Sequence, residues 1–100
     1  QAAENGCTPL YVACQNGHLG CAQLLLEAGA AIDQAKHDAT TPLFIACQEG
    51  HLECLQLLLE AGAAINQATE DGATPLFIAS EKGQLVCARL LLEAGVAMDQ

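Results

Sequence analysis

Residues 41–50, with the sequence TPLFIACQEG, have close copies on both sides, TPLYVACQNG at residues 8–17 and TPLFIASEKG at residues 74–83. The copies begin at Thr8, Thr41 and Thr74, so their spacing is constant. A fixed period of about 33 residues is typical of stacked units, none of which can bury its hydrophobic face alone. We therefore expect residues 1–100 to form one array, with units at about residues 1–33, 34–66 and 67–99.

Each unit carries the signals of two helices. Thr followed by Pro predicts the start of the first helix, because the Thr hydroxyl satisfies a free amide and Pro lacks one. A second helix is expected from about residues 19, 52 and 85, through three consecutive leucines whose wide apolar arc requires contacts with neighbouring units. Glycines predict where the helices end. They are Gly17, Gly50 and Gly83 for the first helices and Gly29, Gly62 and Gly95 for the second.

The rest of each unit, such as residues 30–40, has no helical period and is expected to form a hairpin connector. The order Thr, Pro, Leu, aromatic, any residue, Ala, followed by a Gly-His pair in two units, resembles the ankyrin repeat. The resemblance covers the whole chain. It implies an all-α repeat fold, an α-solenoid in which antiparallel helix pairs stack and projecting β-hairpin loops join them.

The departures from the ankyrin pattern fall in the hairpins. Tyr11, Phe44 and Phe77 stand where the family usually has His. The hairpin Gly is kept in the first and third units but is Ala39 in the second. A positive φ at that position would cost an alanine on the order of 1 kcal/mol.

Composition and charge narrow the class of partner. The chain is 52% hydrophobic but only 3% aromatic, so its core is built from small aliphatic residues and Cys. No apolar run is long enough for a membrane span, and no signal-peptide pattern occurs. The net charge of −9 repels nucleic-acid phosphates and anionic lipid surfaces. We expect neither a nucleic-acid nor a membrane partner.

The cysteines and histidines suggest a metal site, but the repeat explains them better. Cys14, His18 and Cys21 recur as Cys47, His51 and Cys54, a set of atoms that zinc would accept. These positions correspond to core residues and to the Gly-His pair of the repeat, and a free Cys packs as a small hydrophobe. We expect these four cysteines and Cys87 to be buried, with Cys7 alone in a turn, and no metal, cofactor or disulfide framework. Free thiols favour a reducing compartment, cytoplasmic or nuclear.

The resemblance places function on a concave surface made by the hairpin tips and the first helices. No nucleophile, base and orienting group are gathered, so we expect no enzyme activity and no small-molecule substrate. We expect a protein or peptide partner, and the acidic character of the face favours a basic one. The expected binding residues are Glu4, Asn5, Cys7, Gln15, Asn16, His37, Asp38, Thr40, Gln48, Glu49, Glu70, Asp71, Ala73, Glu81 and Lys82.

Other roles stay open at this point. The array could be a spacer in a longer ankyrin protein, since the third unit is as apolar as the others and has no polar cap. Asn66 corresponds to the hairpin Asn that an asparaginyl hydroxylase modifies in similar arrays.

Glu27, Glu60 and Glu93 recur on the opposite, convex side, where we expect a solvated face. The rings of Tyr11, Phe44 and Phe77 are expected to pack hairpin against helix, or to offer apolar contacts beside the groove.

Overall fold

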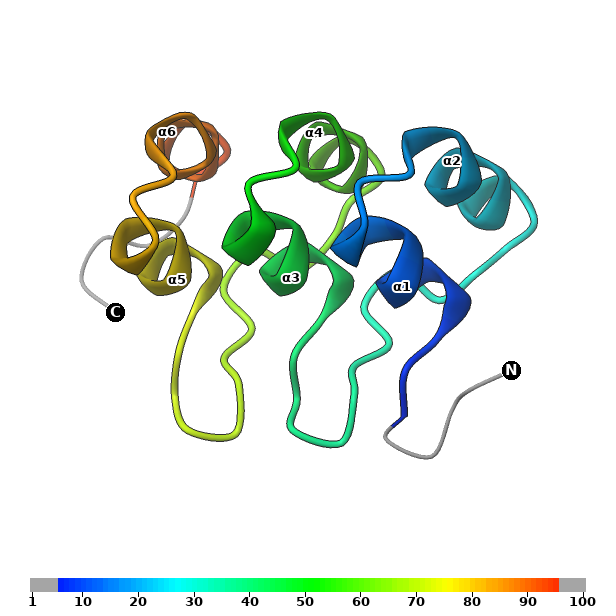
Figure 1. Cartoon of the computed structure of the whole chain (residues 1–100), viewed down its shortest axis with the longest axis horizontal. Helices are drawn as coiled ribbons and strands as arrows, with labels where there is room; N and C mark the ends of the chain where they lie inside the picture. Colours follow the sequence, from blue (N-terminus) through cyan, green and yellow to red (C-terminus); the bar gives the residue numbers. More distant parts are fainter. Residues whose placement is uncertain (1–5, 96–100) are drawn as a thin grey trace.

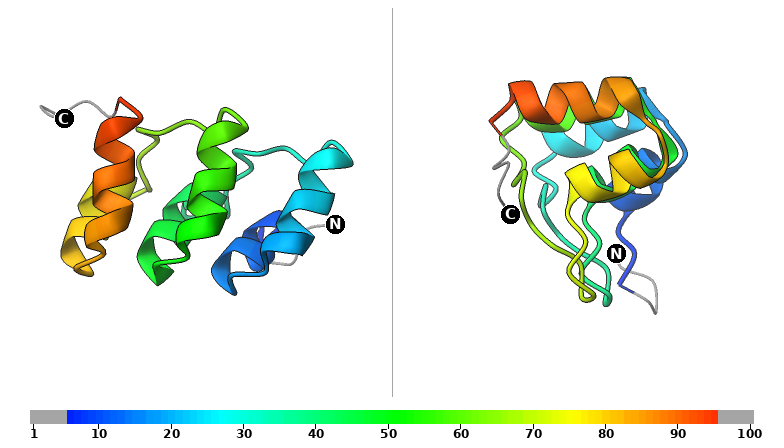
Figure 2. Two further views of the ribbon diagram at one scale, coloured as in Figure 1. Left: turned by 90° about the horizontal axis from the view of Figure 1, so that it is seen from above. Right: turned by 90° about the vertical axis from the view of Figure 1, so that its left-hand side faces the viewer.

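The computed structural model describes residues 6–95, which contain three helix pairs. The first helices are α1 (Pro9–Gln15), α3 (Pro42–Glu49) and α5 (Pro75–Glu81). The second helices are α2 (Leu19–Glu27), α4 (Leu52–Glu60) and α6 (Leu85–Glu93). The first helices stack in one layer and the second helices in another, and the connectors project beyond the first layer (Figures 1 and 2). The all-α repeat architecture is confirmed.

The expected helix starts are also confirmed, and each is made in the same way. The Thr8 hydroxyl accepts a hydrogen bond from the Tyr11 amide at 3.1 Å, and Pro occupies the first turn of the helix. Thr41 and Thr74 cap α3 and α5 identically. These side chains satisfy an amide that has no partner inside the helix.

In each helix pair, the turn between the two helices and the turn after the second helix contain a residue in the left-handed conformation, as the glycine positions predict. The turn between the two helices has φ of +73° at Gly17 and at Gly50. At these two sites an added Cβ would also lie 2.7 Å from the His51 ring and 2.6 Å from the Gln84 amide, respectively. Each glycine therefore also makes room for a side chain of the next helix pair.

We call the two described connector tips, residues 36–40 and 69–73, the first and second fingers. The Lys36 amide donates to the Thr40 carbonyl at 2.9 Å, and the Thr69 amide donates to the Ala73 carbonyl at 2.8 Å. The two fingers are joined by the Glu70 amide, which donates to the Asp38 carbonyl at 2.9 Å. Within residues 6–95 the fingers are loops, with no residue in a β-strand. Ala39 does adopt the left-handed conformation, with φ of +70°.

The core lies between the two helix layers and between neighbouring pairs. Leu43, Leu55 and Leu58, in the middle pair, are completely buried. At some equivalent positions the residue of an outer described pair is more exposed. Val12 is 41% exposed, whereas its counterpart Ile45 is 3% exposed. Burial is therefore a property of the stack and not of the single unit.

Candidate functional site

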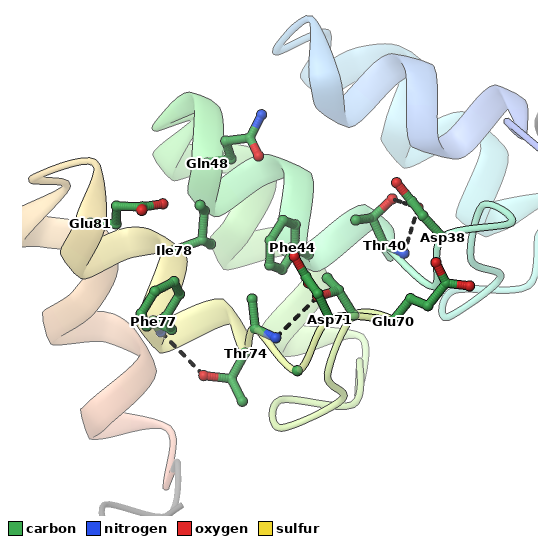
Figure 3. A pocket seen from close by; sticks show the side chains of 13 residues that line it. Asp38, Thr40, Phe44, Gln48, Glu70, Asp71, Thr74, Phe77, Ile78 and Glu81 are labelled. Carbon is green, nitrogen blue, oxygen red and sulfur yellow. Dashed lines mark hydrogen bonds between the residues drawn. The ribbon is translucent and has the colours of Figure 1, made fainter.

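A groove of about 780 Å³ lies between the first and second fingers and the helices α3 and α5. Figure 3 shows Phe44, Phe77 and Ile78 between the finger side and the helix ends. The lining residues are Asp38, Thr40, Phe44, Gln48, Thr69, Glu70, Asp71, Gly72, Ala73, Thr74, Phe77, Ile78 and Glu81. The groove thus combines an apolar centre with a polar rim.

The rim of the groove is negatively charged. Asp38 lies on the first finger, Glu70 and Asp71 on the second, and Glu81 at the end of α5. All four side chains are exposed. Among the described lining residues there are four carboxylates and no Lys, Arg or His. The groove therefore offers a cation several partners and repels an anion.

The Asp38 carboxylate is held in place by its own finger. Its Oδ1 accepts a hydrogen bond from the Thr40 hydroxyl at 2.6 Å and another from the Thr40 amide at 3.1 Å. The hydroxyl bond is the main reason that the pKa of Asp38 lies below its usual value, and the positive charge of Lys36 adds to it. Asp38 therefore stays ionised at neutral pH while its side chain remains exposed to solvent.

The second finger holds its aspartate by a different route. The Thr69 hydroxyl donates to Asp71 Oδ1 at 2.5 Å and accepts from the Ala73 amide at 3.0 Å. Thr40 is the last residue of the first finger and Thr69 is the first residue of the second finger. Each nevertheless orients the aspartate at the tip of its own finger. The two carboxylates are therefore fixed by local contacts that need no partner protein.

The aromatic residues after Thr-Pro-Leu differ in how far they are covered. Tyr11 is 2% exposed, and Lys36 Nζ lies 5.2 Å from its ring centroid, within the range of a cation–π interaction. Phe44 is 5% exposed and Phe77 is 55% exposed. The expectation of hairpin-to-helix packing is confirmed for Tyr11, which contacts Lys36 and Thr40 of the first finger, and Phe44 is buried. Phe77 is the ring left open beside the groove.

The sequence-predicted binding residues do not all meet at this groove. Seven of them line it: Asp38, Thr40, Gln48, Glu70, Asp71, Ala73 and Glu81. Six others lie elsewhere among the described residues: Cys7, Gln15, Asn16, His37, Glu49 and Lys82. Glu4 and Asn5 lie outside the described residues. Sequence reasoning did not assign Ile78 or Thr74 to the site, because the repeat pattern accounts for both as scaffold.

The burial of the cysteines agrees with expectation except at one position. Cys14, Cys47, Cys54 and Cys87 are buried, and Cys7 is half-buried. The sequence predicts that Cys21 also lies in the core, but it is exposed. Its counterparts Cys54 and Cys87 lie on α4 and α6, each of which contacts the second helix of the preceding pair, and no described pair precedes that of α1 and α2.

One of the two histidines of the candidate metal set, His51, has a structural role in the stack. His51 Nε2 lies 3.0 Å from the Gln15 carbonyl oxygen, a contact in which the ring N–H donates. Gln84 makes the equivalent contact with the Gln48 carbonyl at 3.4 Å. Within the described part of the chain, no three His, Cys, Asp or Glu side chains are grouped to hold a metal ion. No helix there is both long and apolar enough to cross a bilayer.

Comparison with known proteins identifies the repeats. The family model described as ankyrin repeats, three copies, matches residues 29–100, and the model for a single ankyrin repeat matches residues 5–37. A probable E3 ubiquitin-protein ligase of Oryza sativa subsp. japonica is 51% identical over 35 residues, and an E3 ubiquitin-protein ligase of Arabidopsis thaliana is 53% identical over 34 residues. These matches cover 35% and 34% of this chain but only 7% of each relative.

Proposed function

The chain belongs to the ankyrin repeat family, and we propose that it acts by holding a basic segment of another protein in the groove between its two fingers. Ankyrin repeats are generally protein-interaction modules. The observation that carries the proposal is the groove itself, in which four carboxylates surround an apolar centre. A Lys or Arg side chain suits such a site, because its aliphatic stem packs on apolar surface while its charged end reaches the carboxylates.

The contact between the first and second helix pairs already contains a lysine beside an aromatic ring and a carboxylate. Lys36 lies over the Tyr11 ring, close to the charge of Asp38. In the second finger, Thr69 occupies the position that Lys36 has in the first finger. No cationic side chain from the described residues therefore lines the groove. We infer that the partner supplies a positive charge there, with the exposed Phe77 ring as the apolar contact.

The proposal assigns the chain a binding role without catalysis, cofactor or small-molecule substrate. Ankyrin repeats are typically non-catalytic. Any ligase activity of the relatives belongs to those proteins, since the chain spans about 7% of their length. We propose that the described helix pairs and the terminal residues act as one array in a reducing compartment, where cysteine thiols persist.

Modification of Asn66 is a second candidate function, favoured by one observation. Asn66 is exposed at the base of the second finger, whereas Asp33 at the equivalent position is half-buried and accepts a hydrogen bond from the Ala64 amide at 3.0 Å. A hydroxylase could therefore reach the Asn66 amide. Mass spectrometry of the protein from its native source would detect the added oxygen, and an unmodified Asn66 would contradict this role.

The binding proposal is tested with labelled peptides that contain Lys, Arg and one large apolar residue, measured against acidic peptides of equal length. Glu70→Lys combined with Glu81→Lys should weaken binding of the basic peptides about tenfold and reduce its salt dependence. Within the described residues neither side chain makes a hydrogen bond or ion pair, so the fold should tolerate both changes. The matched control, Glu60→Lys with Glu93→Lys, changes net charge equally on the opposite face.

Phe77→Ala tests the apolar contact, and Leu92→Ala is its control because Leu92 is 42% exposed outside the groove. Loss of affinity in Phe77→Ala alone supports the proposal. If the double substitution of Glu60 and Glu93 abolished binding and that of Glu70 and Glu81 left it intact, the binding face would have been assigned to the wrong side of the stack. Equal affinity for acidic and basic peptides would contradict a basic partner.

A further inference from the structure

Equivalent positions of the three helix pairs show which residues of a pair face the preceding pair. Val12 is 41% exposed, whereas Ile45 and Ile78, at the same position of the second and third pairs, are 3% and 6% exposed. Within residues 6–95 only the second and third pairs have a preceding pair, so this position packs against it. We call the exposed set on the first pair the leading face, and its residues are Pro9, Val12, Cys21 and Leu24.

The third pair shows the opposite pattern. Phe77 is 55% exposed, whereas Tyr11 and Phe44 are 2% and 5% exposed, so this position packs against the following pair. We call the exposed set on the third pair the trailing face, and its residues are Phe77, Ser80, Leu85 and Leu92. The first and third pairs lie at opposite ends of the row of helix pairs, as Figure 1 shows.

The two faces hold most of the exposed apolar side chains of the described residues. Six large hydrophobic side chains are exposed there, and all of them except Val86 belong to one of the two faces. The most exposed are Leu24 on the leading face, at 68%, and Leu85 on the trailing face, at 69%. Apolar surface gathered in this way favours association, because contact removes it from water.

A polar contact recurs at both junctions between neighbouring pairs. His51 Nε2 lies 3.0 Å from the Gln15 carbonyl oxygen, and Gln84 Nε2 lies 3.4 Å from the Gln48 carbonyl oxygen. Each of these side chains fills the space beside the glycine turn of the preceding pair, Gly17 or Gly50. A junction therefore needs a donor side chain on one pair and an open glycine turn on the other.

The two ends of the described stack each hold one half of this contact. Gly83 has the same left-handed backbone as Gly17, with φ of +69°, but no atom lies within 4 Å of its added Cβ. His18 occupies the position of His51 in the first pair, and its side chain is exposed. The open glycine turn belongs to the third pair and the donor to the first.

We propose that the chain associates end to end with a second copy of itself, so that the trailing face of one copy packs on the leading face of the next. In this contact His18 of the second copy enters the open turn at Gly83 and donates to the Glu81 carbonyl. A second copy is the occupant that fits, because the contact continues a junction that the chain already makes twice. Helix α1 contacts α3 and α3 contacts α5, and α5 would contact α1 of the next copy.

The charges at the two ends permit this contact. Lys82 and Arg89 balance Glu81 and Glu93 on the third pair, and Glu27 is the single acidic residue in the helices of the first pair. The net charge of −9 on each copy still repels the other copy at long range. Salt screens that repulsion, so we expect added salt to strengthen the association between copies.

The association is measured by sedimentation equilibrium of the 100-residue chain under reducing conditions, from about 10 µM to about 1 mM. The two faces are different surfaces, so each added copy leaves one face of each kind free and growth does not stop at two. We expect an average mass that rises with concentration beyond twice the monomer mass, and more steeply at higher salt. A mass that stays at the monomer value, or that levels off at a dimer, would contradict the proposal.

Leu24→Glu and Leu85→Glu each block one face at a side chain of almost equal exposure. Each variant alone should stay monomeric where the wild-type protein associates, since every copy lacks the same face. An equal mixture should form a dimer and nothing larger, because the trailing face of Leu24→Glu and the leading face of Leu85→Glu remain intact. Gln56→Glu, at an exposed position of the middle pair, is the matched control and should associate as the wild-type protein does.

His18→Ala tests the polar contact and should weaken the association about fivefold, with the circular dichroism of the monomer unchanged. A mixture of the two face variants that stayed monomeric would overturn the proposal, as would association of either variant alone. Phe77 also lines the groove, so it is left unchanged in these variants. Leu24, Leu85 and His18 lie outside the groove, so the affinity for basic peptides should be the same in all three variants and is tested separately.

Discussion

The junction between the first and second helix pairs differs in its chemistry from the junction between the second and third. In the first junction the Tyr11 hydroxyl lies 3.3 Å from Thr40 Oγ1, and Lys36 covers the ring. The Thr40 hydroxyl gives its hydrogen to Asp38, so Tyr11 is the donor in this chain of bonds. In the second junction the aromatic residue is Phe44, which has no hydroxyl.

The two junctions nevertheless have the same backbone. The fingers close with the same hydrogen bonds, and the helix turns have the same φ at Gly17 and Gly50. Polar side-chain contacts are therefore not what defines the stack. They distinguish one junction from the other, and they leave the second junction with acidic groups that are available to a partner.

The largest expected effect is on the glycine turns. Gly17→Ala and Gly50→Ala incur the same backbone cost, since both residues have φ of +73°. The added Cβ meets the rigid His51 ring in the first case and the movable end of Gln84 in the second. We expect Gly17→Ala to lower the free energy of unfolding by about 2 to 3 kcal/mol and Gly50→Ala by about 1 to 2 kcal/mol.

Urea denaturation measures both variants. Gly62→Ala is the control for the backbone alone, because no atom lies within 4 Å of its added Cβ, and it should cost about 1 kcal/mol. Equal losses in all three variants would mean that the side chains of the next pair do not depend on the space at Gly17 and Gly50.

A smaller effect is expected from removing the hydroxyl that distinguishes the first junction. Tyr11→Phe leaves the ring and its lysine cover in place but removes one hydrogen bond, at a cost of about 1 kcal/mol. Thr40→Ala in the same background should then lose only the contribution of its bond to Asp38. A double-mutant cycle measures the coupling, and additive losses would show that the contact between the Tyr11 and Thr40 hydroxyls contributes nothing.

The sequence was sufficient to predict the helices and the stack, because these depend on local signals that recur in every unit. Thr-Pro starts and Gly ends require only a few residues each, and all of them occur where expected. The contact of His51 with the Gln15 carbonyl could not be predicted, because it depends on the separation between neighbouring pairs.

The failures concern positions whose environment differs between equivalent units. Cys21 occupies the same position of its unit as Cys54, but no described pair precedes it. Phe77 and Phe44 are equivalent in sequence, and the sequence left both packing and exposure beside the groove open for them; only Phe44 is buried. A repeat pattern specifies the position of a residue within its unit and not how far the neighbouring described units cover it. The exposed ring and the groove therefore emerge only from the assembled stack.

The fingers offer a further comparison, between Ala39 and its counterpart Gly72. Both residues are left-handed, with φ of +70° and +90°. Ala39→Gly should relieve the Cβ strain, and part of this gain is offset by the greater freedom of glycine in the unfolded chain. We expect a net stabilisation of about 0.5 kcal/mol, measured by urea denaturation. Gly72→Ala should act in the opposite direction, and stabilisation by that change would contradict the argument.

The smallest expected effect concerns the ionisation of Asp38. Hydrogen bonds from Thr40 hold the pKa of Asp38 below its usual value, so the folded state favours the carboxylate. A group with a lowered pKa stabilises the fold above its unfolded pKa, near 4, and that contribution is lost as the pH falls through the folded pKa. The effect is small, because Asp38 is exposed to solvent.

The wild-type protein should therefore lose slightly more stability than Asp38→Asn between about pH 5 and pH 3. Thr40→Val removes the hydroxyl donor and should raise the pKa of Asp38, which carboxyl chemical shifts in an NMR titration measure directly. The second finger supplies the control, because Thr69→Val should leave the Asp38 titration unchanged. If Thr40→Val left the pKa of Asp38 where it was, the Thr40 hydroxyl could not be what fixes this carboxylate at the edge of the groove.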